Sequence, residues 1–252
     1  MNILGIIPAR FGSSRFPGKP LVKIGGKTMI QRVYEQAQKA EKLSAVIVAT
    51  DHEEIFQTVQ DFGGMAVMTI PEHPSGTDRC LEAARKYSEP VDIVINIQGD
   101  EPFIRPEQID QLASLLEAEN VEIGTLVKPI NDSDTLIDPN KVKVVLGAKN
   151  RALYFSRSAI PFVKDTSLKD WTSKHTFYKH LGLYGYKMDT LNEISHMQPT
   201  ALEEAESLEQ LRWLENGKLV YTAITRHESL SVDTPEDLKK VELMLQQQPE
   251  LR

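Results

Sequence analysis

The sequence predicts an α/β protein built on a mostly parallel sheet with helices on both faces. Short apolar runs alternate with amphipathic segments through the first half of the chain. The strands expected in this half cover residues 3–7, 45–49, 66–68 and 93–97. The helices expected there cover residues 29–40, 53–62, 78–87 and 106–116. Because parallel strands require crossover connections and are covered on both faces, this alternation favours three α/β/α layers.

Residues typical of helix ends lie at the boundaries of the expected helices. Gly63-Gly64 follows the second helix as a C-cap, and Pro106 stands where the fourth helix begins. After about residue 122 the pattern changes to strands with fewer helices between them. These later strands are expected at 125–127, 142–146, 152–155, 181–186 and 219–223, with helices at 207–215 and 235–247 and an exposed loop at 164–174. We therefore expect one domain over residues 1–252 whose strand-rich segment, about 125–190, carries a dimer contact.

Composition excludes several classes of protein. The 252 residues are 40% hydrophobic and 26% charged, which is ordinary for a soluble globular domain. The single cysteine, Cys80, cannot form an intrachain disulfide, and the apolar run at the N-terminus stops at Pro8. No apolar run approaches the roughly 20 residues that span a bilayer. We expect a cytoplasmic protein without membrane insertion, and the net charge of −7 argues against a nucleic-acid partner.

The strongest local signal is a basic, glycine-containing loop directly after the first strand. It runs from Pro8 to Pro20 and holds three cations, two glycines and two serines. Glycine lets backbone amides approach phosphate oxygens, while arginine and lysine supply forked donors and a point charge. The spacing excludes a Walker A loop, because five residues separate Gly12 from Gly18 and Pro20 replaces the metal-binding hydroxyl. The loop indicates a polyphosphate site, and a solvated basic turn is the alternative.

Two aspartates are candidates for a metal site. Asp100 follows the strand at 93–97 in Gln-Gly-Asp-Glu-Pro, and Asp233 precedes the last helix in Val-Asp-Thr-Pro-Glu. A few carboxylates with phosphate oxygens and water are sufficient for magnesium. The alternatives are a turn-forming role for Asp100 and a helix start at Asp233.

Other polar groups lie at element ends and on one later strand. The Ser75–Arg79 segment reads as a helix N-terminus, and Asp51 could face a ligand or cap a helix. Arg157 could clamp a carboxylate. His180 and Tyr184 share one strand face, although a lone histidine is more often structural. Residues 208–212 could form an exposed helix face. The histidines lack zinc-ligand spacing, and no nucleophile elbow is present.

Together these motifs resemble one family. The loop has the form P-A-R-x-x-S-x-R-x-P-G-K-P-L of the 3-deoxy-manno-octulosonate (Kdo) cytidylyltransferases, which activate an acidic sugar with CTP. Gln-Gly-Asp-Glu-Pro, Val-Asp-Thr-Pro-Glu-Asp-Leu, the strand Tyr178–Tyr186 and Leu-Glu-Gln-Leu-Arg match further motifs. The resemblance extends from Ile6 to Leu238. Phe11-Gly12 departs from the common Tyr-Ala without touching the expected chemistry.

The resemblance implies a nucleotide-diphospho-sugar-transferase-like (Rossmann-like) fold with a strand-rich dimerisation insertion, and a homodimer. It implies transfer of CMP from CTP to Kdo with release of pyrophosphate, Mg²⁺ as cofactor, and a role in lipopolysaccharide synthesis. The implied CTP ligands are Arg10, Ser13, Arg15, Lys19, Ser75 and Arg79. The implied magnesium ligands are Asp100 and Asp233, which with Arg10 and Lys19 form the catalytic set. The implied sugar ligands are Gln98, Arg157, His180, Tyr184, Glu209 and Gln210.

Two alternatives to this function stay open at the level of sequence. Another acidic acceptor, such as sialic acid or the 8-amino analogue of Kdo, would fit the same chemistry. A non-catalytic CTP-binding protein would keep the fold and release no pyrophosphate. A dinucleotide-dependent oxidoreductase is disfavoured, because the glycine fingerprint is missing after the first strand.

Overall fold

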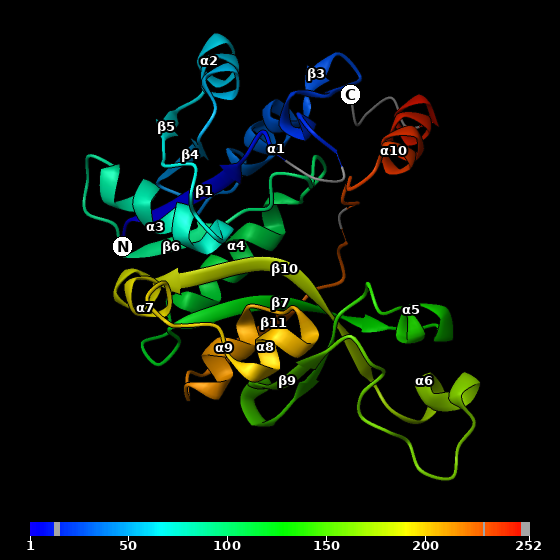
Figure 1. The fold of residues 1–252 in the computed structure, drawn as a ribbon. Helices are drawn as coiled ribbons and strands as arrows, with labels where there is room; N and C mark the ends of the chain where they lie inside the picture. Colours follow the sequence, from blue (N-terminus) through cyan, green and yellow to red (C-terminus); the bar gives the residue numbers. More distant parts are fainter. Residues whose placement is uncertain (13–15, 229, 248–252) are drawn as a thin grey trace. The chain divides into compact units, whose positions relative to one another are not determined.

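The computed structural model describes residues 1–12, 16–228 and 230–247 (Figure 1). The chain divides into two compact units, one of residues 1–113 with 229–252 and the other of residues 114–228. The expected single domain over residues 1–252 stays a prediction, and the strands of the second unit extend past the expected segment of about 125–190. The strand at 220–224 returns to pair with the strand at 123–130, which extends the strand-rich part toward the C-terminus.

The first unit contains four strands that pair in parallel. These are β1 (Ile3–Ala9), β4 (Ala45–Thr50), β5 (Ala66–Met68) and β6 (Ile93–Asn96). β1 lies between β4 and β6, and β5 extends the sheet beyond β4, all in parallel pairing. Nearly every residue of β1, β4 and β6 is buried. Because consecutive strand residues point to opposite faces, both faces of these strands are covered. The expected α/β class with a mostly parallel sheet is confirmed.

Helices and one small hairpin complete this unit. The helices are α1 (Met29–Ala37), α2 (Glu53–Asp61), α3 (Gly76–Lys86), α4 (Pro106–Leu116) and α10 (Pro235–Gln247). The short strands β2 (Lys23–Ile24) and β3 (Lys27–Thr28) form the hairpin before α1. Val241 and Leu245 of α10 pack with Ile24 and Met29 in one apolar cluster. This packing brings the C-terminal helix to the N-terminal part of the chain.

The second unit is richer in strands, as the sequence predicts. Its strands are β7 (Ile123–Ile130), β8 (Lys143–Leu146), β9 (Ala152–Ser156), β10 (Phe177–Lys187) and β11 (Val220–Ile224). β10 runs antiparallel to β7 and β8, β9 is antiparallel to β8, and β11 is parallel to β7. Its helices are α5 (Ser133–Ile137), α6 (Trp171–Lys174), α7 (Met188–Ile194), α8 (Ala201–Glu206) and α9 (Gln210–Glu215). In the described part of the chain, no helix combines the length and apolar character needed to cross a bilayer.

Two local predictions in the second unit are wrong. The stretch 164–174 is not only an exposed loop, because it ends in α6, where Trp171 is buried and stacks on Phe177. The helix expected at 207–215 begins later, as α9 at Gln210, because Ser207 adopts a left-handed conformation (φ 51°) that ends a preceding helix, α8, which the sequence did not predict. Glu209 therefore precedes α9, and Gln210 is its first residue.

Candidate active site

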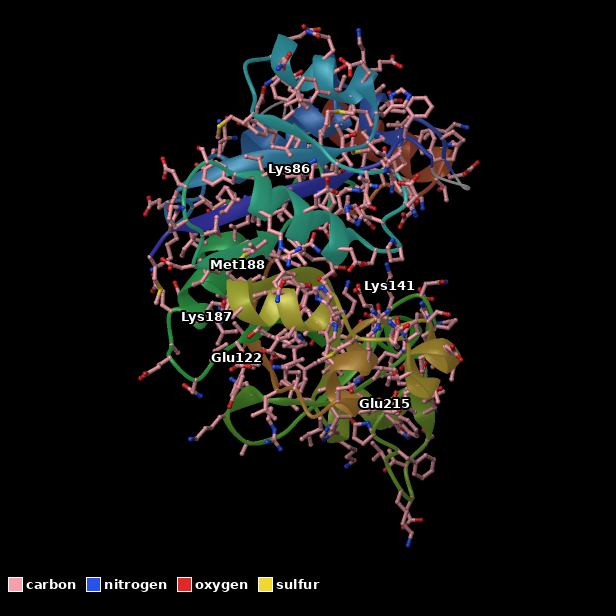
Figure 2. All side chains as sticks on the ribbon, turned by 60° about the vertical axis from the view of Figure 1, so that its left-hand side comes forward. Lys86, Glu122, Lys141, Lys187, Met188 and Glu215 are labelled. Atoms are coloured by element: carbon pink, nitrogen blue, oxygen red, sulfur yellow. The ribbon has the colours of Figure 1, made fainter. Side chains whose placement is uncertain are left out.

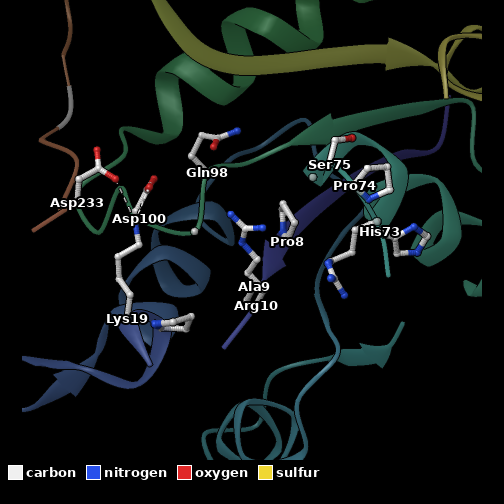
Figure 3. A pocket seen from close by; sticks show the side chains of 14 residues that line it. Pro8, Ala9, Arg10, Lys19, His73, Pro74, Ser75, Gln98, Asp100 and Asp233 are labelled. Carbon is white, nitrogen blue, oxygen red and sulfur yellow. Dashed lines mark hydrogen bonds and ion pairs between the residues drawn. The ribbon is translucent and has the colours of Figure 1, made fainter. Parts of the chain in front are cut away.

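A pocket of about 370 Å³ opens in the first unit where β1 and β6 end. Its lining comes from the end of β1, the turn after β6, the loop before α3 with the start of that helix, and three residues from distant parts of the chain, Lys19, Pro20 and Asp233. Figure 3 shows these side chains around the cavity. Ligands of open α/β sheets bind beyond the carboxyl ends of the strands, so the topology and the polar lining agree.

Lys19 joins the two aspartates at one end of the pocket. Its Nζ donates to Oδ2 of Asp100 at 2.8 Å and to Oδ1 of Asp233 at 3.2 Å (Figure 3). The lysine side chain is 16% exposed, against 25% for Asp100 and 40% for Asp233. Two carboxylates therefore converge on one cationic nitrogen at the edge of solvent.

A backbone hydrogen bond explains how the aspartates meet. The amide of Val232 donates to the carbonyl of Asp100 at 2.9 Å, which places the next residue, Asp233, beside Asp100. Helix α10 is capped by other residues. Thr234 Oγ1 accepts from the amide of Asp237, and the Asp237 carboxylate accepts from the amide and hydroxyl of Thr234. Asp233 thus lies at a helix start, but its own carboxylate is directed to Lys19.

The backbone of the basic loop is closed at its base. The amide of Gly18 donates to the carbonyl of Phe11 at 3.0 Å, and Gly18 has φ 69°, a conformation that glycine adopts without strain. Arg10 is exposed and lines the pocket. Ser13 and Arg15, both expected at the CTP phosphates, lie outside the described residues.

The turn after β6 brings Gly99 close to the backbone of β1. A Cβ at Gly99 would lie 3.0 Å from the carbonyl oxygen of Pro8, so a larger residue would displace this turn. Gln98 and Asp100 flank the glycine, and both line the pocket. The alternative of a purely turn-forming Asp100 does not account for its bond to Lys19.

The donors at this end fit magnesium. Among the described residues, no group of three or more histidine, cysteine or acidic side chains gathers to hold a metal ion. Asp100 and Asp233 nevertheless converge within 3.2 Å of the Lys19 ammonium, which is a stand-in cation for them. Magnesium is commonly bound by one or two carboxylates and completed by substrate phosphates and water. The pair suits a metal that arrives with a nucleotide.

Ser75 and Arg79 both line the pocket and both have structural partners. Ser75 Oγ accepts from the amide of Asp78, so the helix-cap alternative is confirmed for this residue. The Arg79 guanidinium donates to Asp51, to the hydroxyl of Thr69 and to the carbonyl of Ile70. Asp51 thus pairs with Arg79 and does not cap α2. Contact of Ser75 and Arg79 with a cytosine base stays a prediction.

Sequence reasoning missed His73 as a pocket residue. It lies two positions before Ser75, lines the cavity and contacts the Glu82 carboxylate through Nε2. Its spacing from the other histidines does not suit a zinc site, and the sequence motifs predict no other role for it. The usable signal was its place in the loop between β5 and α3, since such loops surround ligands in α/β sheets.

Two of the expected sugar ligands touch each other in the second unit. The rings of His180 and Tyr184 lie 5.1 Å apart on β10, despite a bulge between Leu181 and Tyr184. His180 Nε2 is 3.0 Å from Thr125 Oγ1, and burial lowers the pKa of His180 to about 3, so its ring is neutral. Burial raises the pKa of Tyr184, with smaller contributions from Tyr186 and Glu209.

The Tyr184 hydroxyl has no hydrogen-bond partner among the described residues, although this side chain is only 8% exposed. Buried polar groups of proteins are nearly always satisfied. An unsatisfied hydroxyl beside a neutral imidazole is therefore suited to a polar ligand. Trp213 of α9 packs edge-on against Tyr184, which places the helix beginning at Gln210 on the same side of β10.

Arg157 makes contacts different from those expected of a carboxylate clamp. Its guanidinium donates to the backbone carbonyls of Pro139, Glu206 and Ser207. These bonds join the end of β9 to the turn between α8 and α9, just before Glu209. The arrangement favours a positioning role for Arg157, and direct contact with a sugar carboxylate stays a prediction, as it does for Gln98, Glu209 and Gln210.

Comparison with known proteins identifies the family of this chain. A family model described as Cytidylyltransferase matches residues 4–222. The chain belongs to the cytidylyltransferase family. A protein of Cytophaga hutchinsonii named 3-deoxy-manno-octulosonate cytidylyltransferase is 53% identical, with 96% of each chain covered. A Parabacteroides distasonis protein of the same name is 52% identical, covering 95% of this chain and 96% of its own. The resemblance found in the motifs is confirmed.

Solved structures support the fold assignment. A structure of CMP:2-keto-3-deoxy-manno-octonic acid synthetase complexed with CTP is 41% identical and superposes with a TM-score of 0.90, covering 98% of this chain and 99% of its own. The 4-diphosphocytidyl-2C-methyl-D-erythritol synthase of Anaerococcus prevotii is 13% identical with a TM-score of 0.65, over 97% of this chain and 96% of its own. That second likeness shows the fold alone.

Proposed function

We propose that the protein transfers CMP from CTP to 3-deoxy-manno-octulosonate, giving CMP-Kdo and pyrophosphate. The observation that carries this proposal is the convergence of Asp100 and Asp233 on Lys19 at one end of the pocket. The names of relatives about half identical to this chain, and the CTP bound in a structure of the same fold, support the choice of nucleotide and sugar.

In this reaction the anomeric hydroxyl of the sugar acid attacks the α-phosphorus in line, and pyrophosphate leaves. Arg10 and Lys19 bind phosphate oxygens and stabilise the negative charge that grows on the leaving group. Asp100 and Asp233 would hold Mg²⁺, which when bound screens the phosphate oxygens and lowers the pKa of the attacking hydroxyl. The chain then contributes positioning and electrostatics, with no covalent enzyme intermediate.

We assign recognition of the sugar acid to the polar cluster of the second unit. The neutral His180 imidazole and the unsatisfied Tyr184 hydroxyl supply hydrogen-bonding atoms in a largely apolar surrounding. Hydrogen bonds in such surroundings discriminate strongly between a ligand with matching groups and one that lacks them. We also propose that the protein acts in lipopolysaccharide synthesis in the cytoplasm and that it forms a homodimer through the strand-rich unit.

The test is pyrophosphate release from CTP with a panel of acidic sugars. The wild-type protein is expected to prefer Kdo over sialic acid, and Asp100→Ala is expected to lose turnover while its circular dichroism spectrum stays native. Asp61→Asn is a matched control, because Asp61 is an exposed carboxylate on α2 outside the pocket. Near-normal turnover of Asp100→Ala would exclude the proposed metal site.

The same panel tests the other candidate functions. A clear preference for the 8-amino analogue would change the acceptor while keeping the cytidylyltransferase chemistry. CTP binding without pyrophosphate release, with every sugar of the panel, would indicate a non-catalytic nucleotide-binding protein.

A further inference from the structure

The loop between β5 and α3 holds a histidine whose orientation is fixed by an acid. His73 lines the pocket, and its Nε2 contacts Oε2 of Glu82, which lies on α3. Both side chains are mostly buried, at 14% and 18% exposure. No described residue hydrogen-bonds to the other ring nitrogen, Nδ1. Because Glu82 holds Nε2, Nδ1 is the ring nitrogen left for a hydrogen bond to a ligand.

Glu82 is the centre of a small network that fastens this loop. Its carboxylate accepts from the amide of Ile70 at 3.0 Å and from Nζ of Lys86 at 2.6 Å. Lys86, labelled in Figure 2, also donates to the carbonyl of Met68 at the end of β5. Thus one acid ties both the loop backbone and the His73 ring to α3.

The charge of Glu82 determines which nitrogen of His73 carries the proton. Burial alone raises the pKa of Glu82, but hydrogen bonds from Lys86, His73 and the Ile70 amide outweigh it and lower this pKa to about 2. An ionised carboxylate only accepts hydrogen bonds, so Nε2 of His73 must donate. In the neutral ring, Nδ1 is then an acceptor.

The position of His73 in the pocket indicates which part of a nucleotide it meets. Figure 3 shows Lys19, Asp100 and Asp233 at one end of the cavity and His73 and Pro74 at the other, with Arg10 between them. With the phosphates at the first end, the base of the same nucleotide extends toward the second. Cytosine carries an exocyclic amino donor on C4, whereas uracil carries a carbonyl acceptor there.

We propose that His73, oriented by Glu82, selects cytosine by accepting a hydrogen bond at Nδ1 from the exocyclic amino group of the base. A uracil oxygen at that position would face a second acceptor, so UTP loses a bond and meets a repulsive contact. This inference rests on the proposed function, since it takes the nucleotide to be CTP with its phosphates at Lys19.

The test compares CTP with UTP. We expect His73→Ala to lower the ratio of kcat/KM for CTP to that for UTP by about tenfold or more, mainly through loss of CTP activity, because one substrate hydrogen bond disappears. Glu82→Gln should lower the same ratio, because a carboxamide no longer requires Nε2 to donate. Glu72→Gln, an exposed acid of the same loop, is the matched control and should keep the wild-type ratio.

Nitrogen NMR of ¹⁵N-histidine-labelled protein gives a readout that does not depend on turnover. The His73 ring of the wild-type protein should be protonated at Nε2 and unprotonated at Nδ1. A protonated Nδ1, in the neutral or the charged ring, or a CTP/UTP ratio within twofold of wild type in folded His73→Ala, would overturn the inference. A merely structural role would lower CTP and UTP activity equally.

Calorimetric binding of CTP and UTP without sugar separates this inference from the proposed function. One outcome is that no sugar is activated, CTP binds more tightly than UTP, and His73→Ala removes that preference. The proposed CMP transfer is then wrong, and the proposed role of His73 is supported. If CMP transfer occurs and His73→Ala keeps the preference, only the role of His73 is wrong. If His73→Ala does not fold, the CTP/UTP ratio of Glu82→Gln and the NMR measurement of the His73 ring test the inference instead.

Discussion

Replacing Lys19 by methionine tests the cationic end of the pocket. Methionine keeps much of the aliphatic volume and removes the ammonium that joins Asp100 at 2.8 Å and Asp233 at 3.2 Å. These ion pairs are partly exposed, so each stabilises the fold by about 1 kcal/mol or less. The free energy of unfolding should therefore fall by about 2 kcal/mol or less, which for a protein of this size lowers Tm by about 8 °C or less.

The effect on the reaction should be larger than the effect on the fold. A preorganised cation at a departing pyrophosphate acts on charge that develops in the transition state, and loss of one such group costs about 10²–10³ in rate. Pyrophosphate release measured at saturating Kdo and varied CTP gives kcat and KM, and differential scanning calorimetry gives Tm. Lys23→Met is the matched control, because Lys23 is an exposed lysine of β2 outside the pocket.

Two results would refute this reasoning. A kcat/KM for CTP within tenfold of wild type would show that Lys19 does not stabilise the leaving group. A loss of activity fully accounted for by unfolding at the assay temperature would show that the lysine acts only on the fold. Lys23→Met should change neither quantity by more than experimental error.

Two further predictions concern buried polar groups. Tyr184→Phe removes a hydroxyl that has no hydrogen-bond partner among the described residues. The free energy of unfolding should therefore stay within about 1 kcal/mol of wild type, while KM for the sugar acid rises about tenfold. A loss of stability above about 2 kcal/mol, or an unchanged KM, would contradict this prediction. The pKa of Glu82 is lowered in the folded state to about 2 from an ordinary 4.5, so its ionised form stabilises the fold above pH 4.5, and that stability is lost as pH falls toward 2. Chemical unfolding over this pH range should therefore show that Glu82→Gln is less stable than wild type at pH 5 and 6. The difference in the free energy of unfolding should shrink as the pH approaches 2. A difference that stays constant with pH would contradict the lowered pKa of Glu82.

The first unit could be predicted well from sequence because its signals are local. Buried strands such as β1 and β6 are short apolar runs, and Pro106 and Gly63 mark helix ends within a residue or two of the structure. The hairpin of β2 and β3 was missed, since two-residue strands have no periodicity to detect. Its turn at Gly25-Gly26, both with positive φ, was its clearest signal.

The second unit was predicted less well because its folding depends on contacts distant in sequence. Trp171 appears in a polar stretch, but its burial against Phe177 turns that stretch into a packed segment. The break between α8 and α9 depends on a left-handed serine, Ser207, a conformation for which sequence gives little indication.

For the site, motifs selected several residues that line the pocket, such as Lys19, Asp100 and Asp233, but did not predict the partners of these residues. The meeting of Asp100 and Asp233 depends on one backbone bond, from Val232 to Asp100, that no spacing rule predicts. Likewise Arg157 has the residue type of a carboxylate clamp, yet three backbone carbonyls take its donors. The role of His73 depends on Glu82, nine residues away, and so becomes visible only when α3 is placed beside the loop.

The most direct test of the account is the position of a divalent metal in crystals grown with CTP and Mn²⁺. Anomalous scattering should place manganese between the carboxylates of Asp100 and Asp233, in contact with phosphate oxygens of the nucleotide. Manganese bound to the nucleotide but away from both aspartates would contradict the central claim that this carboxylate pair is the metal site.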